Sequence, residues 1–237
     1  MGAPTNAAHD ERLDEGMRLQ RALVTAAEAE GATQAGWKAG FGAPAARERF
    51  GLDAPLVGAL LDRTRLEPGA VARIGGWKEP RAEAELALLL GEDVDGAASP
   101  EEAMAAVAAL APAIELVDLD PPPESPLDAL SGNVFHRHWM TGEFVPLPAG
   151  ADLSGLTADI SAMGTDIGTV HDLEALTGDA AEVLVEVARI GARHGRRLLG
   201  GDIVILGSVL PPTSVMSGGA FRFSLNGSGP IEVRFSD

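Results

Sequence analysis

The sequence of 237 residues contains no cysteine, so it can form neither a disulfide framework nor a thiolate-ligated zinc site. No run approaches the roughly 18 to 20 consecutive apolar residues that span a bilayer. Residues 1–9 also lack the apolar core of a secretory signal peptide. Together these absences predict a cytoplasmic protein.

The sequence also lacks the short motifs of two common enzyme classes. It has no Gly-x-Gly-x-x-Gly segment and no Walker lysine loop, so nucleotide binding has no support. It has no Gly-x-Ser-x-Gly elbow, which counts against a serine hydrolase of the α/β type.

Positive charge is scarce. The chain has 18 Lys and Arg against 35 Asp and Glu, which gives a formal net charge of −17. Such a surface repels phosphate backbones and anionic lipid headgroups, so we expect neither nucleic-acid nor membrane partners. A small anionic substrate would need a local positive charge, and only two lysines occur, Lys38 and Lys78.

Hydrophobic periodicity predicts the secondary structure. Helical spacing occurs at 8–30, 100–110 and 179–194, and one or two helical turns are expected at 44–50. Extended segments are predicted at 35–41, 56–61, 70–74, 82–90, 114–119, 135–141, 156–162, 203–206, 220–225 and 231–235. This order indicates an α+β domain dominated by a rolled, mostly antiparallel sheet.

The chain shows no internal repeat, no low-complexity linker and no clear domain boundary. We therefore expect a single catalytic domain over residues 1–237. It would consist of an N-terminal helical segment at 1–32 and a β-rich catalytic core at 33–237.

Three carboxylates are candidates for a metal site. Glu83 and Glu85 share one face of a predicted strand, because side chains alternate along a strand with a period of two. Glu115 lies in the apolar strand Ala-Ile-Glu-Leu-Val, where a buried carboxylate requires a cation or a proton. If the three converge, they would suit Mg²⁺, which prefers oxygen ligands. A Glu-x-Glu pair is also typical of a solvated strand face, and spacing leaves both interpretations open.

Four segments resemble the 2-keto-4-pentenoate hydratase family of the fumarylacetoacetate hydrolase superfamily. They are GWKAGF at 36–41, PRAEAELA at 80–87, PAIELVD at 112–118 and GDIVILG at 201–207, followed by Pro211 and Pro212. The resemblance runs in consistent order from about residue 36 to the C-terminus. It implies a fumarylacetoacetate hydrolase-like mixed β-sandwich roll with flanking helices and an N-terminal helix.

The resemblance also implies a site. Glu83, Glu85 and Glu115 would be the ligands of Mg²⁺ or Mn²⁺, and Lys38 would be the lysine of the family's Gly-aromatic-Lys-x-Gly motif. A 2-keto acid can chelate the metal through its carboxylate and keto oxygens, and the metal would then stabilise an enolate. Lys38 would neutralise the substrate carboxylate or relay a proton, tasks that suit a lysine whose pKa is lowered by burial.

Other positions follow the family pattern less closely. Many relatives carry an Asp where this chain has Leu56, and the nearby Asp62 is a candidate replacement. His171 is a candidate general base in a segment that departs from the family. The candidates for substrate binding are Ser131 and Asn133, in the segment SGNVF, and Pro212, in the proline-bearing loop.

Two further histidines flank Arg137 on a predicted strand. His136 and His138 would then face one side of the sheet. They could form a second metal site or recognise a carboxylate, but no third ligand lies nearby in the sequence. We expect both to face solvent.

The family resemblance implies a lyase that hydrates a 2-hydroxy-2,4-dienoate, with a small anionic 2-keto acid as its substrate. The alternatives within the superfamily are a decarboxylase of the 4-oxalocrotonate type and a hydrolase of carbon–carbon bonds in acylpyruvates. Outside catalysis, the chain could be a non-catalytic partner subunit of a pathway enzyme. The intact set of Lys38 and three glutamates argues against that role, and the family suggests a homo-oligomer.

Overall fold

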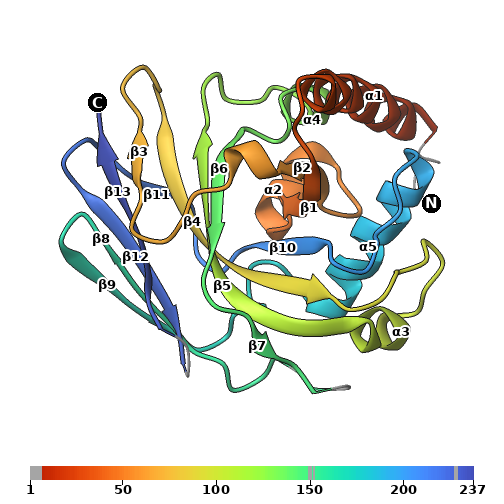
Figure 1. The fold of residues 1–237 in the computed structure, drawn as a ribbon. Helices are drawn as coiled ribbons and strands as arrows, with labels where there is room; N and C mark the ends of the chain where they lie inside the picture. The colour runs from red at the N-terminus through yellow and green to blue at the C-terminus, as the bar shows by residue number, and fades with distance from the viewer. Residues whose placement is uncertain (1–6, 149–150, 152, 227–228) are drawn as a thin grey trace.

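The fold is built from two β-sheets that share one hydrophobic core (Figure 1). The structure is a computed structural model that describes residues 7–148, 151, 153–226 and 229–237. The first sheet has the strand order β2-β1-β10-β4-β5-β6, with β11 paired to β4 and β7 paired to β5. Its strands are β1 (Gln34–Gly40), β2 (Leu56–Leu61), β4 (Pro80–Leu90), β5 (Val107–Asp118), β6 (His136–Thr141), β7 (Val145–Pro146), β10 (Ile203–Ser208) and β11 (Thr213–Ser214).

The second sheet has the order β3-β13-β12-β8-β9 and lies against β5 of the first (Figure 1). Its strands are β3 (Val71–Arg73), β8 (Ala158–Ala162), β9 (Thr165–Val170), β12 (Ala220–Leu225) and β13 (Ile231–Ser236). Phe221, Phe223 and Ile160 from this sheet join Ile114 and Leu116 of β5 in the core. Only the pairs β1–β10 and β3–β13 are parallel among the described strands, so the predicted mostly antiparallel α+β roll is confirmed.

The long hairpin of β4 and β5 is the centre of the molecule. Its antiparallel register places Glu83 opposite Glu115. Ala82, Ala84 and Leu86 on the other face of β4 are almost completely buried in the core. The period-two alternation therefore separates an apolar face, which belongs to the shared hydrophobic core, from a face that carries carboxylates.

Helices flank the first sheet. They are α1 (Ala7–Ala29), α2 (Pro44–Phe50), α3 (Pro100–Ala105), α4 (Pro126–Ser131) and α5 (Ala180–Arg193), with a 3₁₀ turn, η1, at Asp62–Thr64. Helix α1 packs on α4 and β2, and α5 packs on β1 and β10. None of the described helices combines the length and apolar character needed to cross a membrane.

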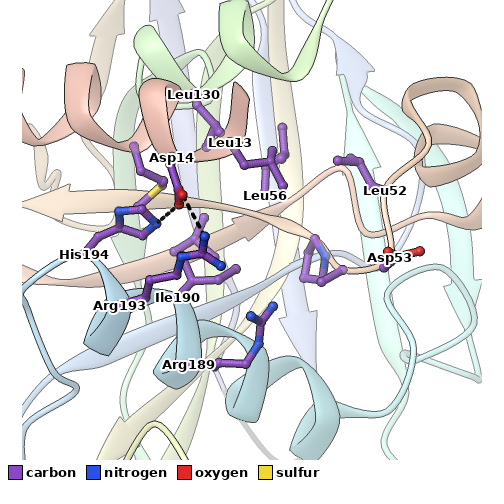
Figure 2. A pocket seen from close by; sticks show the side chains of 14 residues that line it. Leu13, Asp14, Leu52, Asp53, Leu56, Leu130, Arg189, Ile190, Arg193 and His194 are labelled. Carbon is purple, nitrogen blue, oxygen red and sulfur yellow. Dashed lines mark hydrogen bonds and ion pairs between the residues drawn. The ribbon is translucent and has the colours of Figure 1, made fainter. Parts of the chain in front are cut away.

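A cavity of about 250 Å³ separates α1 from α5 (Figure 2). At one side Asp14 of α1 pairs with Arg193 at 2.6 Å and with His194 at 3.3 Å. Leu56 lines this cavity and is 3% exposed.

Three local expectations differ from the structure. The helix predicted at 100–110 ends at Ala105, because the segment from Val107 onward pairs with β4 instead. A capping box between Ser99 and Glu102 starts this helix, but strand pairing decides where it stops. The short helix α4 and the polar edge strand β9 were not predicted, since neither has a clear apolar period.

Gln20 fastens α1 to the sheet. Its side chain is buried, and Nε2 donates to the carbonyl oxygens of Val57 at 2.9 Å and Leu130 at 3.3 Å. We expect Gln20→Ala to lower the free energy of unfolding by about 1–3 kcal/mol, because it removes two buried hydrogen bonds. Urea denaturation checks this value. The control Arg18→Ala, which breaks an exposed pair with Glu15, should change the midpoint little, and equal effects of both variants would contradict the prediction.

Candidate metal centre

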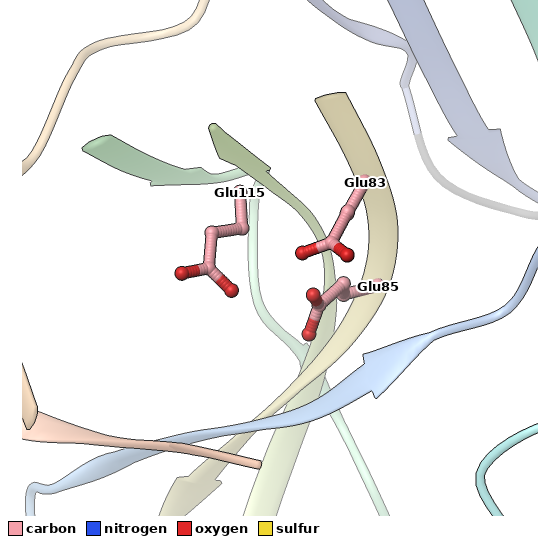
Figure 3. Close-up of side chains that lie close together, drawn as sticks. All are labelled: Glu83, Glu85 and Glu115. Atoms are coloured by element: carbon pink, nitrogen blue, oxygen red, sulfur yellow. The ribbon is translucent and has the colours of Figure 1, made fainter. Parts of the chain in front are cut away.

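Three glutamates from two adjacent strands converge at one point. Glu83 and Glu85 come from β4 and Glu115 from β5, and one carboxylate oxygen of each lies within 4.8 Å of the others. Figure 3 shows the carboxylates of Glu83 and Glu85 turned toward that of Glu115. The register Glu83↔Glu115 and the two-residue spacing on β4 produce this convergence.

The cluster concentrates negative charge in a buried place. Glu85 is 1% exposed and Glu115 is 0% exposed. Burial and the neighbouring Glu115 charge raise the pKa of Glu83 to about 7, although Lys38 opposes the shift. Burial and the charges of Glu115 and Glu83 raise the pKa of Glu85 well above its ordinary value. The metal-free cluster therefore holds protons near neutral pH.

Lys38 of β1 is the positive charge of the cluster. Its side chain is 2% exposed, and Nζ lies 2.7 Å from Oε1 of Glu115 and 3.1 Å from the carbonyl oxygen of Val134. Burial alone would lower the pKa of Lys38, but the charges of Glu115, Glu83 and Glu85 raise it. These charges favour the ammonium form of Lys38, whereas a proton relay would be served better by a lowered pKa.

His136 also belongs to the cluster, contrary to the expectation that it faces solvent. It is 7% exposed, its Nδ1 lies 2.7 Å from Oε1 of Glu115, and its Nε2 lies 3.0 Å from Oγ1 of Thr64. His138 is half-buried and stacks on Trp77. The sequence signal for His136 was Glu115 itself, because a carboxylate in an apolar strand needs a partner. Lys38 and His136 are its two partners. Burial raises the pKa of Glu115, but these two neighbours lower it overall.

A left-handed turn sets the positions of Val134 and His136. Asn133, Val134 and Phe135 have φ values of 56°, 54° and 62°, a conformation that residues other than glycine rarely adopt. Asn133 secures the turn, since its Oδ1 accepts from the amide of Ala59 at 2.7 Å and its Nδ2 donates to the carbonyl of Ala59 at 2.9 Å. The side-chain amide of Asn133 is thus hydrogen-bonded to the backbone of Ala59.

Two glycines permit close approach at the cluster. A Cβ on Gly58 would lie 3.0 Å from Cγ of Lys38 and 3.2 Å from Oδ1 of Asn133. Gly207 has a φ of 105°, and its amide donates to Oε2 of Glu85 at 2.9 Å. Gly58 thus leaves room for the Lys38 side chain, and Gly207 directs its backbone amide toward Glu85.

The cluster opens into a cavity of about 380 Å³. Lys38, Glu83 and Glu85 line one part of it, together with the hydroxyl-bearing residues Thr177 and Ser208. The remaining larger side chains of the wall are apolar: Phe41, Val117, Leu119, Val134, Leu176, Leu210, Pro211 and Pro212. Pro212, predicted to bind substrate, thus lines the same cavity as the glutamates.

The other predicted site residues lie elsewhere. Asp62 begins η1 and accepts hydrogen bonds from the amides of Thr33 and Arg63. Ser131 ends α4, where its hydroxyl donates to the carbonyl of Asp128. His171 is exposed, in the turn after β9. None of Asp62, Ser131 and His171 is among the residues lining the cavity, so the geometry gives their predicted roles no support.

The donor set fits a hard divalent cation. Oε2 of Glu115 is buried and has no hydrogen-bond partner among the described residues, although its Oε1 has two. An unpartnered carboxylate oxygen facing two further carboxylates is costly unless a cation or a proton joins them. The three carboxylates could therefore hold a divalent cation that prefers oxygen ligands.

The chain belongs to the fumarylacetoacetate hydrolase family, because the family model described as Fumarylacetoacetate (FAA) hydrolase C-terminal matches residues 41–236. The resemblance drawn from four sequence segments is thereby confirmed, and so is the fold class.

Individual relatives narrow the comparison. A 4-oxalocrotonate decarboxylase from Pseudomonas sp. is 27% identical over 220 residues, covering 92% of this chain and 84% of the relative. A 2-keto-4-pentenoate hydratase from Paraburkholderia xenovorans is 25% identical over 229 residues, covering 95% and 85%. The structure of a 4-oxalocrotonate decarboxylase from Pseudomonas putida G7, complexed with magnesium and adipate, matches with a TM-score of 0.85 at 21% identity. That match covers 93% of this chain and 84% of the other, and it shows a shared fold.

The raised pKa values predict that cation binding depends on pH. A carboxyl group must lose its proton before it ligates a metal ion, so binding at this cluster releases protons. We expect the affinity for a divalent cation to rise as the pH increases through about 7, the pKa of Glu83, and to rise further as Glu85 ionises. Calorimetric titrations from pH 5.5 to 8.5, in buffers of different ionisation enthalpy, measure both affinity and proton release. An affinity independent of pH would contradict the prediction.

Proposed function

We propose that this chain is a divalent-metal-dependent lyase that acts on a 2-keto acid through an enolate. Its most favoured reaction is the hydration of a 2-hydroxy-2,4-dienoate to a 4-hydroxy-2-keto acid. The observation that carries the proposal is the buried cluster of three glutamates, with the unpartnered Oε2 of Glu115, at the polar part of an otherwise apolar cavity. The curated hydratase and decarboxylase relatives support it.

Glu83, Glu85 and Glu115 would hold the cation, and Mg²⁺ is the proposed ion, with Mn²⁺ as a substitute of similar ligand preference. When bound, the ion supplies Lewis-acid stabilisation of the negative charge that develops on a keto oxygen.

Lys38 has two proposed tasks. Its ammonium holds Oε1 of Glu115, which leaves Oε2 directed to the cation site. Because its pKa is raised, Nζ acts as a charge and a proton donor rather than as a base. It lines the cavity and is thus available to the carboxylate or the enolate carbon of a substrate. His136 would hold Glu115 from a second direction and so limit the rotation of its carboxylate.

One observation favours a second reaction, decarboxylation of the 4-oxalocrotonate type. The family resemblance places Leu56 where many hydratases carry an Asp, and Leu56 is buried and lines the other cavity, between α1 and α5 (Figure 2). Hydration must deliver water and a proton, whereas decarboxylation needs only the stabilised enolate and a proton donor. The ionisable groups that line the larger cavity are Lys38, Glu83 and Glu85.

The metal site is tested by titrating the protein with Mg²⁺ with and without oxalate, which mimics a planar 2-keto acid enolate. We expect the native protein to bind oxalate only when Mg²⁺ is present. Glu115→Gln and Glu83→Gln should each weaken this binding more than about 100-fold, since each removes one proposed ligand.

The matched control is Glu79→Gln, whose exposed carboxylate pairs with Arg81 and should not be needed. Thermal unfolding of each variant shows whether it is folded. The proposal would fail if the native protein bound no metal, or if Glu79→Gln weakened oxalate binding as much as Glu115→Gln does. A non-catalytic subunit would then be the better description of the chain.

Product mass separates the two reactions. We expect incubation with Mg²⁺ and 2-hydroxypenta-2,4-dienoate to give a product heavier by one water. With 2-hydroxymuconate or its keto tautomer, loss of carbon dioxide would identify the decarboxylase instead. Mass spectrometry of quenched reactions, with Glu83→Gln as the inactive control, decides between these outcomes.

A further inference from the structure

We infer that the substrate carries a bulky apolar group at the end away from its 2-keto acid head, rather than a second carboxylate. This inference rests on the proposed function in its hydratase form, since it takes the glutamate cluster as the place where the head binds and since a substrate of the 4-oxalocrotonate type carries a second carboxylate. The inference is drawn from the apolar residues of the cavity wall, which have no role in the proposed metal site.

Strand β5 and its continuation provide a scale along the cavity. Val117 and Leu119 follow Glu115 at intervals of two residues, and both line the cavity. At about 3.3 Å per residue, they lie roughly 7 Å and 13 Å beyond Glu115 along the chain. A ligand that extends from the cluster in this direction therefore meets aliphatic side chains.

Other elements contribute apolar groups to the same wall. Phe41 directly follows β1. Its ring packs edge-on against Phe50, with the ring centroids 5.6 Å apart, and its centroid lies 6.3 Å from that of Phe135. Leu176 precedes α5, and Leu210 lies between β10 and β11. The aromatic cluster fixes the place of Phe41, so the wall offers a formed apolar surface.

Positive charge is confined to the glutamate cluster. Among the described residues that line the cavity, Lys38 is the only cation, and its ammonium is already paired with Glu115. Arg81 lies two residues before Glu83 on β4 and opposite Val117, yet it does not line the cavity. Its guanidinium donates to Oε2 of Glu79 at 2.7 Å and to the carbonyl of Pro80 at 3.3 Å. A second substrate carboxylate would therefore lose its hydration without gaining a counter-ion.

The cavity also has room for more than a short chain. Its volume is about 380 Å³, whereas an engineered protein cavity of about 150 Å³ accommodates benzene. A 2-keto acid head at the cluster thus leaves space for a six-membered ring or a branched alkyl group against Phe41, Val117 and Leu119. Burial of such a group would supply binding energy away from the reacting atoms.

A matched pair of ligands tests the inference. 2-Oxohexanoate and 2-oxoadipate have the same six-carbon chain and differ only in a terminal methyl group or carboxylate. In calorimetric titrations with Mg²⁺ present, we expect 2-oxohexanoate to bind at least tenfold more tightly. Benzylidenepyruvate, which adds a phenyl ring, should bind more tightly still.

Variants test whether the apolar wall at Leu119 produces the preference for 2-oxohexanoate. Leu119→Arg places a cation on the apolar wall and should narrow or reverse the tenfold preference, whereas the neutral Leu119→Gln should not favour 2-oxoadipate to the same extent. Arg81→Gln should leave the ratio of the two affinities unchanged. Oxalate titration of each protein shows whether the head site is intact.

The outcomes are distinguishable. If native protein binds oxalate but holds 2-oxoadipate as tightly as 2-oxohexanoate, the inference is overturned while the proposed function stands. The same holds if Arg81→Gln selectively weakens 2-oxoadipate, because Arg81 would then be a carboxylate receptor. Absence of metal-dependent oxalate binding overturns the proposed function and the inference together.

Discussion

The ion pair between Lys38 and Glu115 is the constraint on which the rest of the structure depends. Their strands, β1 and β5, are separated by β10 and β4 in the first sheet. In a flat sheet the two backbones would be about 14 Å apart, and side chains standing perpendicular to it would not meet. Contact at 2.7 Å between two buried groups therefore requires the sheet to roll (Figure 1). The same roll forms the hollow into which Glu83 and Glu85 project.

The local charge of the cluster differs from that of the molecule as a whole. A chain with a net charge of −17 places one of its two lysines and a buried histidine against a single carboxylate oxygen. These two neighbours lower the pKa of Glu115, while burial and the charge of Glu115 raise the pKa values of Glu83 and Glu85. The three carboxyl groups of the cluster therefore differ in how readily they ionise, with Glu115 the most acidic.

Part of this site could be predicted from sequence because it depends on local periodicity. The Glu-x-Glu spacing fixes the shared face of Glu83 and Glu85 on any strand, and a glutamate in an apolar strand demands a partner. The family resemblance supplied the fold and singled out Lys38. His136 could not be found in this way, since its orientation depends on the left-handed turn at 133–135 and on a register shift between β5 and β6. The role of Asn133 in substrate binding stays a prediction, but its hydrogen bonds to the backbone of Ala59 could not be foreseen, because Ala59 is 74 residues distant in sequence. The end of α3 and the edge strand β9 likewise depend on pairing with other strands rather than on their own composition.

The left-handed turn sets a limit on how this protein can change over evolutionary time. Only glycine adopts such φ values without penalty, yet the chain has Asn, Val and Phe in succession there. A glycine in place of Val134 would relieve the backbone strain. It would also make the carbonyl group that accepts a hydrogen bond from Lys38 more mobile. Selection for thermal robustness and selection for a well-aimed lysine therefore oppose each other at this one residue, and laboratory evolution toward heat resistance would encounter that conflict beside the metal centre.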